Sequence, residues 1–209
     1  MSNGDDERVV TSIEQLERLY GRPAAPSLVK EIDRLHPAYR AYVEMAPLVM
    51  LATSGPGGLD VSPRGDAAPV VHVEDERTLL LPDRRGNNRI DSLRNIVADP
   101  RVALLFLLPG IGETLRVSGT AAIHTDPALL QRFAVDGRPP RTVLRIAIGS
   151  VFFQCSRALV RSRAWDAAAH VPRASVPTPG AVLAALSAEP FDGDAYDRAL
   201  PGRVAETLY

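Results

Sequence analysis

The stretch MLATSGPGGLDVSPRGD, residues 50–66, decides the fold of this chain. It begins inside a compact apolar run at 47–54, which is followed by Gly-Pro-Gly-Gly at 55–58 and by a second extended segment at 59–62. Apolar runs bounded by glycine and proline predict two strands joined by a hairpin turn. The stretch ends in Ser, Pro, Arg, Gly and Asp, a composition that favours a turn at a strand end. The sequence therefore predicts an antiparallel pair that holds an arginine, Arg64, at one end.

More short strands follow this hairpin. Between them, residues 88–97 place Ile90, Leu93, Ile96 and Val97 at helical spacing. There is no strand-helix-strand alternation and no glycine-rich nucleotide fingerprint. The pattern predicts a mainly β fold of the α+β class, an antiparallel β-barrel with one helix inserted between strands. The further strands are expected at 70–73, 78–81, 102–108, 114–123 and 151–159.

The segments on either side of the strands predict helices. Ser12 and Gln15 have the spacing of a capping box. After Trp165 the chain is rich in Ala and Pro, with one short helix expected at 179–188. The N-terminal helices, which form a cap on the barrel, are expected at 12–20, 26–35 and 37–45. We divide the chain into a disordered tail at 1–11, a single domain at 12–170 that includes the cap, and a C-terminal extension at 171–209 packed on the domain.

Composition excludes several classes of protein. The 209 residues are 45% hydrophobic and 23% charged, which suits one folded domain. Lys and Arg together number 24 and Asp and Glu 25, a net charge of −1. That balance argues against a surface that coats nucleic acid or an anionic membrane. The longest apolar run, 102–108, is too short to span a bilayer. We expect neither a nucleic-acid nor a membrane partner.

Cysteine and histidine usage argues against metal chemistry. Cys155 is the only cysteine, so neither an intrachain disulfide nor a cysteine metal cluster can form. It falls in a predicted apolar strand, where we expect a buried, inert thiol. His36, His72, His124 and His170 show no metal-ligand spacing, and we predict no metal. The polar, acidic start does not resemble a signal peptide, so we expect a cytoplasmic protein.

Arginines gather at the predicted strand ends. Lys30 is the only lysine among the basic residues, a bias that a GC-rich genome explains. Arg64 can offer a bidentate fork to a phosphate or carboxylate. The alternative is an exposed salt bridge between Arg64 and Asp66.

A second arginine cluster lies in PDRRGNNRIDSL, residues 82–93, which predicts a strand end, a loop and a helix N-terminus. Asn87 or Asn88 can cap this helix. Arg84, Arg85 and Arg89 oppose the helix dipole, a conflict that an anionic ligand would remove. The alternative is a solvated loop whose arginines pair with Asp83 and Asp91.

A third cluster, RALVRSRAWD at 157–166, contains the only tryptophan. Trp165 beside Arg161 and Arg163 suits a flat, anionic ligand. The alternative is a tryptophan that plugs a barrel end or a dimer interface. No serine lies in a G-x-S-x-G elbow, so a hydrolase triad has no support.

A set of ordered motifs runs along the chain: SPRGD at 62–66, LPDR at 81–84, GNNR at 86–89, NI at 95–96, DPRV at 99–102, ETLRV at 113–117 and residues 155–166. With these motifs, residues 50–125 resemble the pyridoxamine 5′-phosphate oxidase-related flavoproteins, the FMN-binding split-barrel group, and in particular an SPRGD-containing bacterial subgroup. With the N-terminal helices, the resemblance covers roughly residues 12–170. It implies an FMN-binding six-stranded antiparallel split barrel and a homodimer with FMN at the subunit interface.

The resemblance also implies roles for residues. Arg64 matches an arginine that holds the FMN phosphate, and it lies in the SPRGD motif, which begins at Ser62. Asn87, Asn88 and Arg89 match a Ser-Arg-Lys triplet with the same task, and all three are phosphate-compatible donors. Pro82, Asp83 and Arg84 match a segment that lines the ribityl chain and ring edge. Thr114 and Arg116 match a strand by which the partner subunit reaches the flavin. Arg163 and Trp165 match a segment that closes over the flavin.

One departure limits the inferred function. Pyridoxamine phosphate oxidases carry a Tyr, an Arg and a Ser at four-residue spacing for the substrate phosphate, whereas residues 129–145 lack the Tyr and the spacing. We therefore predict an FMN-dependent oxidoreductase that acts on a small organic substrate other than vitamin B6. No side chain is assigned as an obligatory acid or base. The alternatives are a haem-binding or haem-degrading split barrel, with His72 or His170 as axial ligand, and a non-catalytic flavin-binding protein.

Overall fold

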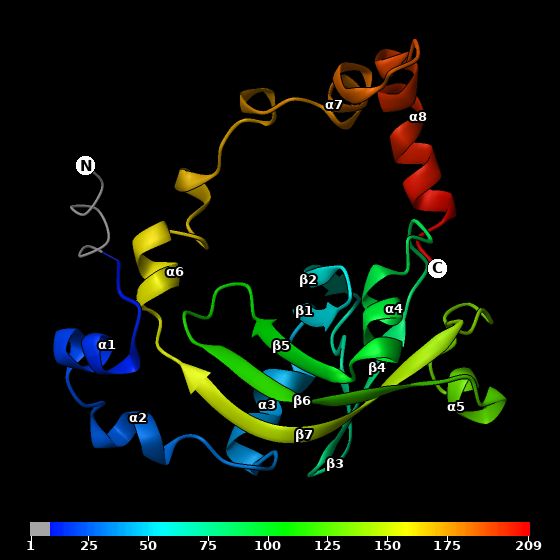
Figure 1. The fold of residues 1–209 in the computed structure, drawn as a ribbon. Coiled ribbons are helices and arrows are strands. Elements are labelled where there is room, and N and C mark those ends of the chain that lie inside the picture. Colours follow the sequence, from blue (N-terminus) through cyan, green and yellow to red (C-terminus); the bar gives the residue numbers. More distant parts are fainter. Residues whose placement is uncertain (1–8) are drawn as a thin grey trace, which may run out of the picture.

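The computed structural model describes residues 9–209, and its centre is one antiparallel sheet (Figure 1). The strands stand in the order β2-β1-β5-β6-β7-β4-β3. The predicted antiparallel β fold is confirmed, with seven strands across the described residues where the resemblance implied six. Seven is the number expected from the apolar runs of the sequence, and the short strand β3 pairs with β4 at one edge of the sheet. The bounds are β1 Leu48–Gly55, β2 Gly58–Gly65, β3 His72–Asp75, β4 Thr78–Asp83, β5 Arg101–Leu107, β6 Thr114–His124 and β7 Thr142–Gln154.

The β1–β2 hairpin is the one predicted from residues 50–66. Its strands pair from Leu48 opposite Gly65 to Gly55 opposite Gly58. Gly58 has a φ of 105°, a left-handed value that favours glycine. Side chains alternate between the two faces of a strand, so Asp60, Ser62 and Arg64 share the more protected face of β2. The hairpin thereby directs three polar side chains to one side.

A bulge bends the two longest strands. The register of β6 on β7 shifts between Ser118 and Gly119. A Cβ atom on Gly119 would clash with the carbonyl oxygen of Ala147, so the close approach requires glycine. Bulges increase local twist, and Figure 1 shows β7 curving under the other strands. This curvature brings the two ends of the sheet toward each other.

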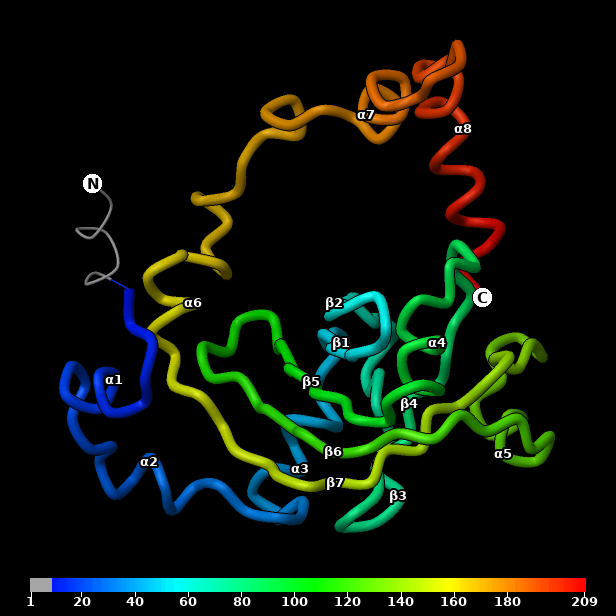
Figure 2. Tube along the Cα trace, in the orientation of Figure 1, coloured from blue at the N-terminus to red at the C-terminus, as the bar shows by residue number. Residues whose placement is uncertain are grey.

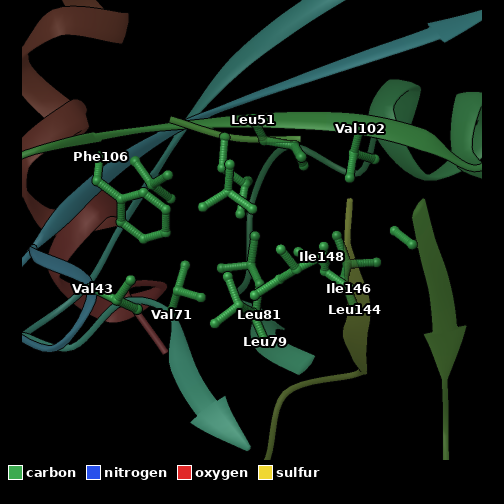
Figure 3. Packing of buried hydrophobic residues seen from close by; sticks show 14 of the residues in the cluster. Val43, Leu51, Val71, Leu79, Leu81, Val102, Phe106, Leu144, Ile146 and Ile148 are labelled. Atoms are coloured by element: carbon green, nitrogen blue, oxygen red, sulfur yellow. The ribbon is translucent and has the colours of Figure 1, made fainter. Parts of the chain in front are cut away.

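The hydrophobic core fills the space inside the curved sheet. Phe106 of β5 and Leu51 of β1 lie opposite Leu79 and Leu81 of β4 (Figure 3), and all four are almost fully buried. Val43 joins them from the N-terminal cap. Burial of this apolar surface is the main favourable contribution to folding.

Three of the described helices pack on the sheet: α3 (Pro37–Glu44) on β3 and β6, α4 (Asp91–Ala98) on β1, β2 and β6, and α5 (Pro127–Gln131) on β7. The predictions for α1 and α3 are confirmed, whereas the helix predicted at 26–35 stops at Val29. It stops because Ile32 leaves the helical path and exchanges two backbone hydrogen bonds with Val151, at 3.0 and 2.7 Å. The bounds are α1 Ile13–Tyr20, α2 Ala25–Val29, α3 Pro37–Glu44, α4 Asp91–Ala98, α5 Pro127–Gln131, α6 Arg157–Ser162, α7 Pro179–Leu186 and α8 Gly193–Glu206.

The strand predicted at 151–159 is wrong in both bounds. β7 begins at Thr142 and ends at Gln154, and residues 157–162 form α6. The apolar periodicity of 143–148 belongs to a strand because it pairs with both β4 and β6. Cys155 follows the strand end and is exposed, not buried as expected. The tail predicted at 1–11 lies mostly outside the described residues.

Residues 163–209, here called the C-terminal arm, arch away from the sheet and return beside α4 (Figures 1 and 2). Within the arm, α7 and α8 pack on each other at Gly180 and Gly193, where a Cβ atom on Gly180 would clash with the Gly193 carbonyl oxygen. The backbone N–H of Gly180 also donates to the Asp197 carboxylate at 2.8 Å. Helix α8 itself was not predicted from the sequence.

Candidate functional site

A cavity of about 950 Å³ lies where the ends of β2 and β4 meet the N-terminus of α4. Its volume is near the upper end of the range, roughly 300–1,000 Å³, that is typical of small-molecule sites. Eight of the predicted site residues line it: Ser62, Arg64, Pro82, Asp83, Arg84, Asn87, Asn88 and Arg89. The sheet curvature therefore brings together two motifs that the sequence separates.

Two ion pairs cross between the strand ends in the cavity wall. Arg64 of β2 pairs with Asp83 of β4, and Arg84, just after β4, pairs with Asp66 at 2.6 Å. The side chains are 10–22% exposed, so both pairs are partly desolvated. The alternative salt bridge between Arg64 and Asp66 is wrong, because each arginine reaches the aspartate of the other segment.

Two buried polar atoms in the wall have no hydrogen-bond partner. Among the described residues, Arg64 Nε and Thr142 Oγ1 are the buried side-chain N and O atoms in this state, and both residues line the cavity. An unsatisfied buried polar group costs about 1–3 kcal/mol. A ligand that accepts hydrogen bonds from both would remove this cost.

The cavity carries excess positive charge. Six arginines line it against four aspartates: Arg64, Arg84, Arg85, Arg89, Arg138 and Arg141, with Asp60, Asp66, Asp83 and Asp91. Arg89 pairs with Asp91 at 2.8 Å, as the alternative interpretation of the loop predicted. Within residues 9–209, Arg85, Arg138 and Arg141 form no salt bridge. These three arginines leave the site cationic.

The N-terminus of α4 faces the same cavity without a side-chain cap. The capping position is Ile90, with a left-handed φ of 53°, and no side chain accepts a hydrogen bond from the first turn. The predicted caps are therefore wrong. Asn87 Oδ1 accepts from the Arg89 backbone N–H at 3.1 Å, and Asn88 Oδ1 accepts from Arg141 at 3.2 Å. Free N–H groups at a helix N-terminus attract anions.

Ser62 belongs to a chain of hydrogen bonds. Its Oγ lies 3.1 Å from Ser92 Oγ, which donates to Asp60 Oδ2 at 2.8 Å. Ser92 is buried in the first turn of α4. This chain fixes the helix N-terminus against β2.

The other four predicted site residues lie outside the cavity. Thr114 begins β6 and is buried. The Arg116 guanidinium lies 4.9 Å from the Phe152 ring centroid. Arg163 pairs with Asp166 at 2.6 Å, and Trp165 Nε1 donates to the Ile111 carbonyl at 2.8 Å. Their expected role involves a partner subunit and stays a prediction.

Sequence reasoning missed residues that line the cavity from distant segments. Arg138 and Arg141 belong to the GRPPR turn at 137–141, whose two arginines were a usable signal. Thr142 and Tyr209 gave none. The Tyr209 hydroxyl donates to Asp66 Oδ1 at 2.7 Å.

The pKa of two groups near the cavity departs from the ordinary value. Burial by itself raises the pKa of Asp66, but the hydrogen bond from Tyr209 and the ion pair with Arg84 outweigh burial and leave the pKa lowered. Burial and the nearby Arg84 charge lower the pKa of His72. Asp66 therefore stays ionised and His72 neutral near pH 7.

Comparison with known proteins agrees with this architecture. Residues 35–155 match the sequence profile of the family described as pyridoxamine 5′-phosphate oxidase. The chain belongs to this family. The match in the pyridoxamine 5′-phosphate oxidase family runs from Leu35 through β7, and it excludes the C-terminal arm together with Trp165 and Tyr209. The predicted resemblance is confirmed.

The solved structures to which this chain is similar share little of its sequence. HupZ of Group A Streptococcus is 22% identical, with 58% of this chain and 95% of that chain covered and a TM-score of 0.47. A putative pyridoxamine 5′-phosphate oxidase from Lactobacillus delbrueckii is 25% identical, with 58% and 95% covered and a TM-score of 0.45. An FAD-binding protein from Mesorhizobium loti is 18% identical, with 57% and 94% covered and a TM-score of 0.39. No curated protein matches significantly.

Residues 9–209 contain neither a helix that could span a membrane nor a cluster of metal-binding side chains. None of the helices between residues 9 and 209 has both the length and the apolar character needed to cross a membrane. In the same part of the chain, no group of three or more His, Cys, Asp or Glu side chains is arranged to hold a metal ion.

Proposed function

We propose that this member of the pyridoxamine 5′-phosphate oxidase family binds FMN in the arginine-lined cavity and is an FMN-dependent oxidoreductase. The observation that carries the proposal is the pair of unsatisfied donors, Arg64 Nε and Thr142 Oγ1, in the wall of one cationic cavity. A phosphate has several acceptor oxygens and two negative charges, and it fits this donor set.

The residues present match the parts of such a cofactor. Arg64 and Arg89 would neutralise the phosphate, with the Asn87 and Asn88 amides and the free N–H groups of α4 as further donors. Pro82, Asp83 and Arg84 would line the ribityl chain and ring edge. Arg64 is already oriented by its ion pair with Asp83, so binding costs little side-chain entropy.

When bound, a flavin supplies hydride and electron transfer. The chain's own residues bind and orient it, and none is assigned as an obligatory acid or base. The substrate is a small organic molecule other than vitamin B6, since residues 129–145 lack the tyrosine and the spacing of pyridoxamine phosphate oxidases.

We further propose a homodimer with FMN at the interface. Thr114 and Arg116 lie outside the cavity of their own chain, as expected of residues that serve the cavity of a second copy. Arg163 and Trp165 lie where the C-terminal arm leaves the domain, and they would close over the cofactor.

Absorbance of the purified protein tests the cofactor. Bands near ~370 and ~450 nm, or their appearance with bound FMN after reconstitution, are expected of a flavin. A protein that neither copurifies with nor binds FMN would exclude the proposal, and a Soret band on haem titration would favour the haem alternative. Reduction of bound FMN by NADH, NADPH or a reduced deazaflavin then distinguishes an oxidoreductase from a non-catalytic flavin-binding protein.

A further inference from the structure

The C-terminal arm ends inside the wall of the cavity. The Tyr209 hydroxyl donates to Asp66 Oδ1, and Arg84 Nε donates to Asp66 Oδ2 at 2.6 Å, so one carboxylate holds both side chains. The Arg84 guanidinium also lies 5.5 Å from the centre of the Tyr209 ring, within cation–π range. Arg138 donates to the main-chain oxygen of Tyr209 at 3.4 Å. Three groups of the cavity wall therefore meet at one residue of the arm.

The rest of the arm has few contacts with the domain. Among the described elements, α7 and α8 pack mainly on each other, and Figure 2 shows the arch standing clear of the sheet. Trp165 holds the start of the arm through its bond to the Ile111 carbonyl. Tyr209 holds the other end. Docking of the arm thus depends on the contacts of Tyr209 with the cavity.

Arg84 is held by contacts that Tyr209 shares. Arg84 Nη1 donates to the Phe133 carbonyl at 2.6 Å, and its Nε depends on Asp66. The Tyr209 hydroxyl donates to the Asp66 carboxylate and favours its ionised form, and the Tyr209 ring lies beside the Arg84 guanidinium. The cavity of about 950 Å³ remains with Tyr209 in its wall, so Tyr209 bounds the site and does not fill it.

We propose that Tyr209 is a positioning residue of the ligand site: by docking on Asp66 it holds Arg84 in place for an anionic ligand and couples the C-terminal arm to ligand binding. This inference rests on the proposed function for the identity of the ligand, FMN. Neither the family match, which ends at residue 155, nor the motifs of the resemblance include this residue.

The test compares the full chain with Tyr209→Phe, which keeps the ring and loses the hydroxyl, and with Tyr209→Ala, which loses both. Tyr20→Phe is the matched control, since Tyr20 is exposed at the end of α1. FMN affinity is measured by quenching of flavin fluorescence. We expect roughly tenfold weaker binding for Tyr209→Phe, the scale of one hydrogen bond to a charged group, and a further loss of about threefold for Tyr209→Ala.

The pH dependence separates positioning from general structural support. The groups that face Asp66 are Arg84, Tyr209 and His72. Without the Tyr209 hydroxyl the pKa of Asp66 rises, so the loss of FMN affinity on acidification begins at a higher pH in Tyr209→Phe than in the wild type. The phosphate of FMN titrates equally in both proteins, and its contribution cancels in the comparison.

Limited trypsin digestion of the ligand-free protein provides a readout that does not involve flavin. We expect cleavage at the exposed arm residues Arg173 and Arg198 to be about tenfold faster in Tyr209→Ala than in the wild type or Tyr20→Phe. Equal cleavage rates in the wild type and Tyr209→Ala would overturn the inference. If the wild type binds FMN, equal FMN affinity of the wild type and both Tyr209 variants would overturn it as well. Failure of the wild type itself to bind FMN would instead exclude the proposed function, while faster cleavage in Tyr209→Ala would still support docking of the arm.

Discussion

Arg64 in β2 and Asp83 in β4 form an ion pair although their strands hold the first and sixth places in the sheet. The pair is possible because the bulge at Gly119 curves β6 and β7 and brings the sheet ends together. The ion pair between Arg84, just after β4, and Asp66, just after β2, joins the same two strand ends. The two pairs neutralise four charges of the cavity wall, and Arg85, Arg138 and Arg141, which form no salt bridge within the described residues, leave the cavity with excess positive charge.

Arg64→Ala should weaken FMN binding by about 1.5–3 kcal/mol, roughly 10- to 150-fold, because it removes a charge-assisted contact to phosphate. The matched control is Arg101→Ala, an exposed arginine of β5 paired with Asp99 outside the cavity. Isothermal titration with FMN measures both. Equal affinity of wild type, Arg64→Ala and Arg89→Ala would contradict the assignment of the phosphate site.

Thr142→Val should have opposite effects on stability and on binding. The change removes a buried hydroxyl without a partner, so the free energy of unfolding of the ligand-free protein should rise by about 1 kcal/mol. FMN affinity should fall, because the ligand loses a donor. Urea unfolding and FMN titration measure the two quantities, with the exposed Thr120→Val of β6 as control. A loss of stability in the ligand-free protein would show that Thr142 has a partner.

The sequence predicts the local parts of this fold well. Gly-Pro-Gly-Gly specifies the first hairpin through turn chemistry, and the pattern at 82–93 specifies a strand end, a loop and a helix N-terminus. The anion site inferred from the arginines at 84–89 stays a prediction. These signals depend on neighbouring residues alone. The family resemblance adds what local patterns lack, because it relates motifs that are far apart in the sequence to one expected cofactor site.

The remaining parts depend on contacts between distant segments. Arg64 pairs with Asp83 instead of Asp66 because the sheet curves, and no local pattern encodes the curvature. The strand predicted at 151–159 starts later than β7 because Arg145 interrupts the apolar run, and Arg145 itself pairs with Leu80 of β4. Tyr209 lies in the cavity wall because the C-terminal arm returns to the domain, and no pattern in the sequence of the arm predicts this path.

Acid should destabilise the protein in part through Asp66. Its pKa in the folded state lies below the ordinary value of about 3.9, since the contacts with Tyr209 and Arg84 outweigh burial. A lowered folded pKa contributes stability that is present above the unfolded pKa and lost as the pH falls through the folded value. Urea midpoints between pH 7 and 3 should therefore fall less steeply in Asp66→Asn below about pH 4. Asp194→Asn, in the first turn of α8, is the control, and equal slopes in the three proteins would contradict the prediction.

Leu81→Ala should destabilise the domain by about 2–5 kcal/mol, the usual cost of a cavity in a packed core. Leu81 is 1% exposed and lies between β7 and β3, whereas the control Leu186, in α7 of the arm, is 80% exposed. Leu186→Ala should change the free energy of unfolding by less than about 0.5 kcal/mol. Urea denaturation measures both, and a small effect at Leu81 would contradict the assigned core.

Mixing two variants tests whether a second copy completes the site. If Arg116 of one chain serves the cavity of the other, then Arg64→Ala and Arg116→Ala each damage every site in their own dimers. Unfolded and refolded together, they form mixed dimers in which both changes fall on one site and the other site is intact. Tight FMN binding should then return in part, as equilibrium titration of the mixture would show. The control mixture is Arg64→Ala with Arg89→Ala, whose changes lie in the same cavity of each chain, so every mixed site stays damaged. Recovery in both mixtures, or in neither, would contradict a site shared between subunits.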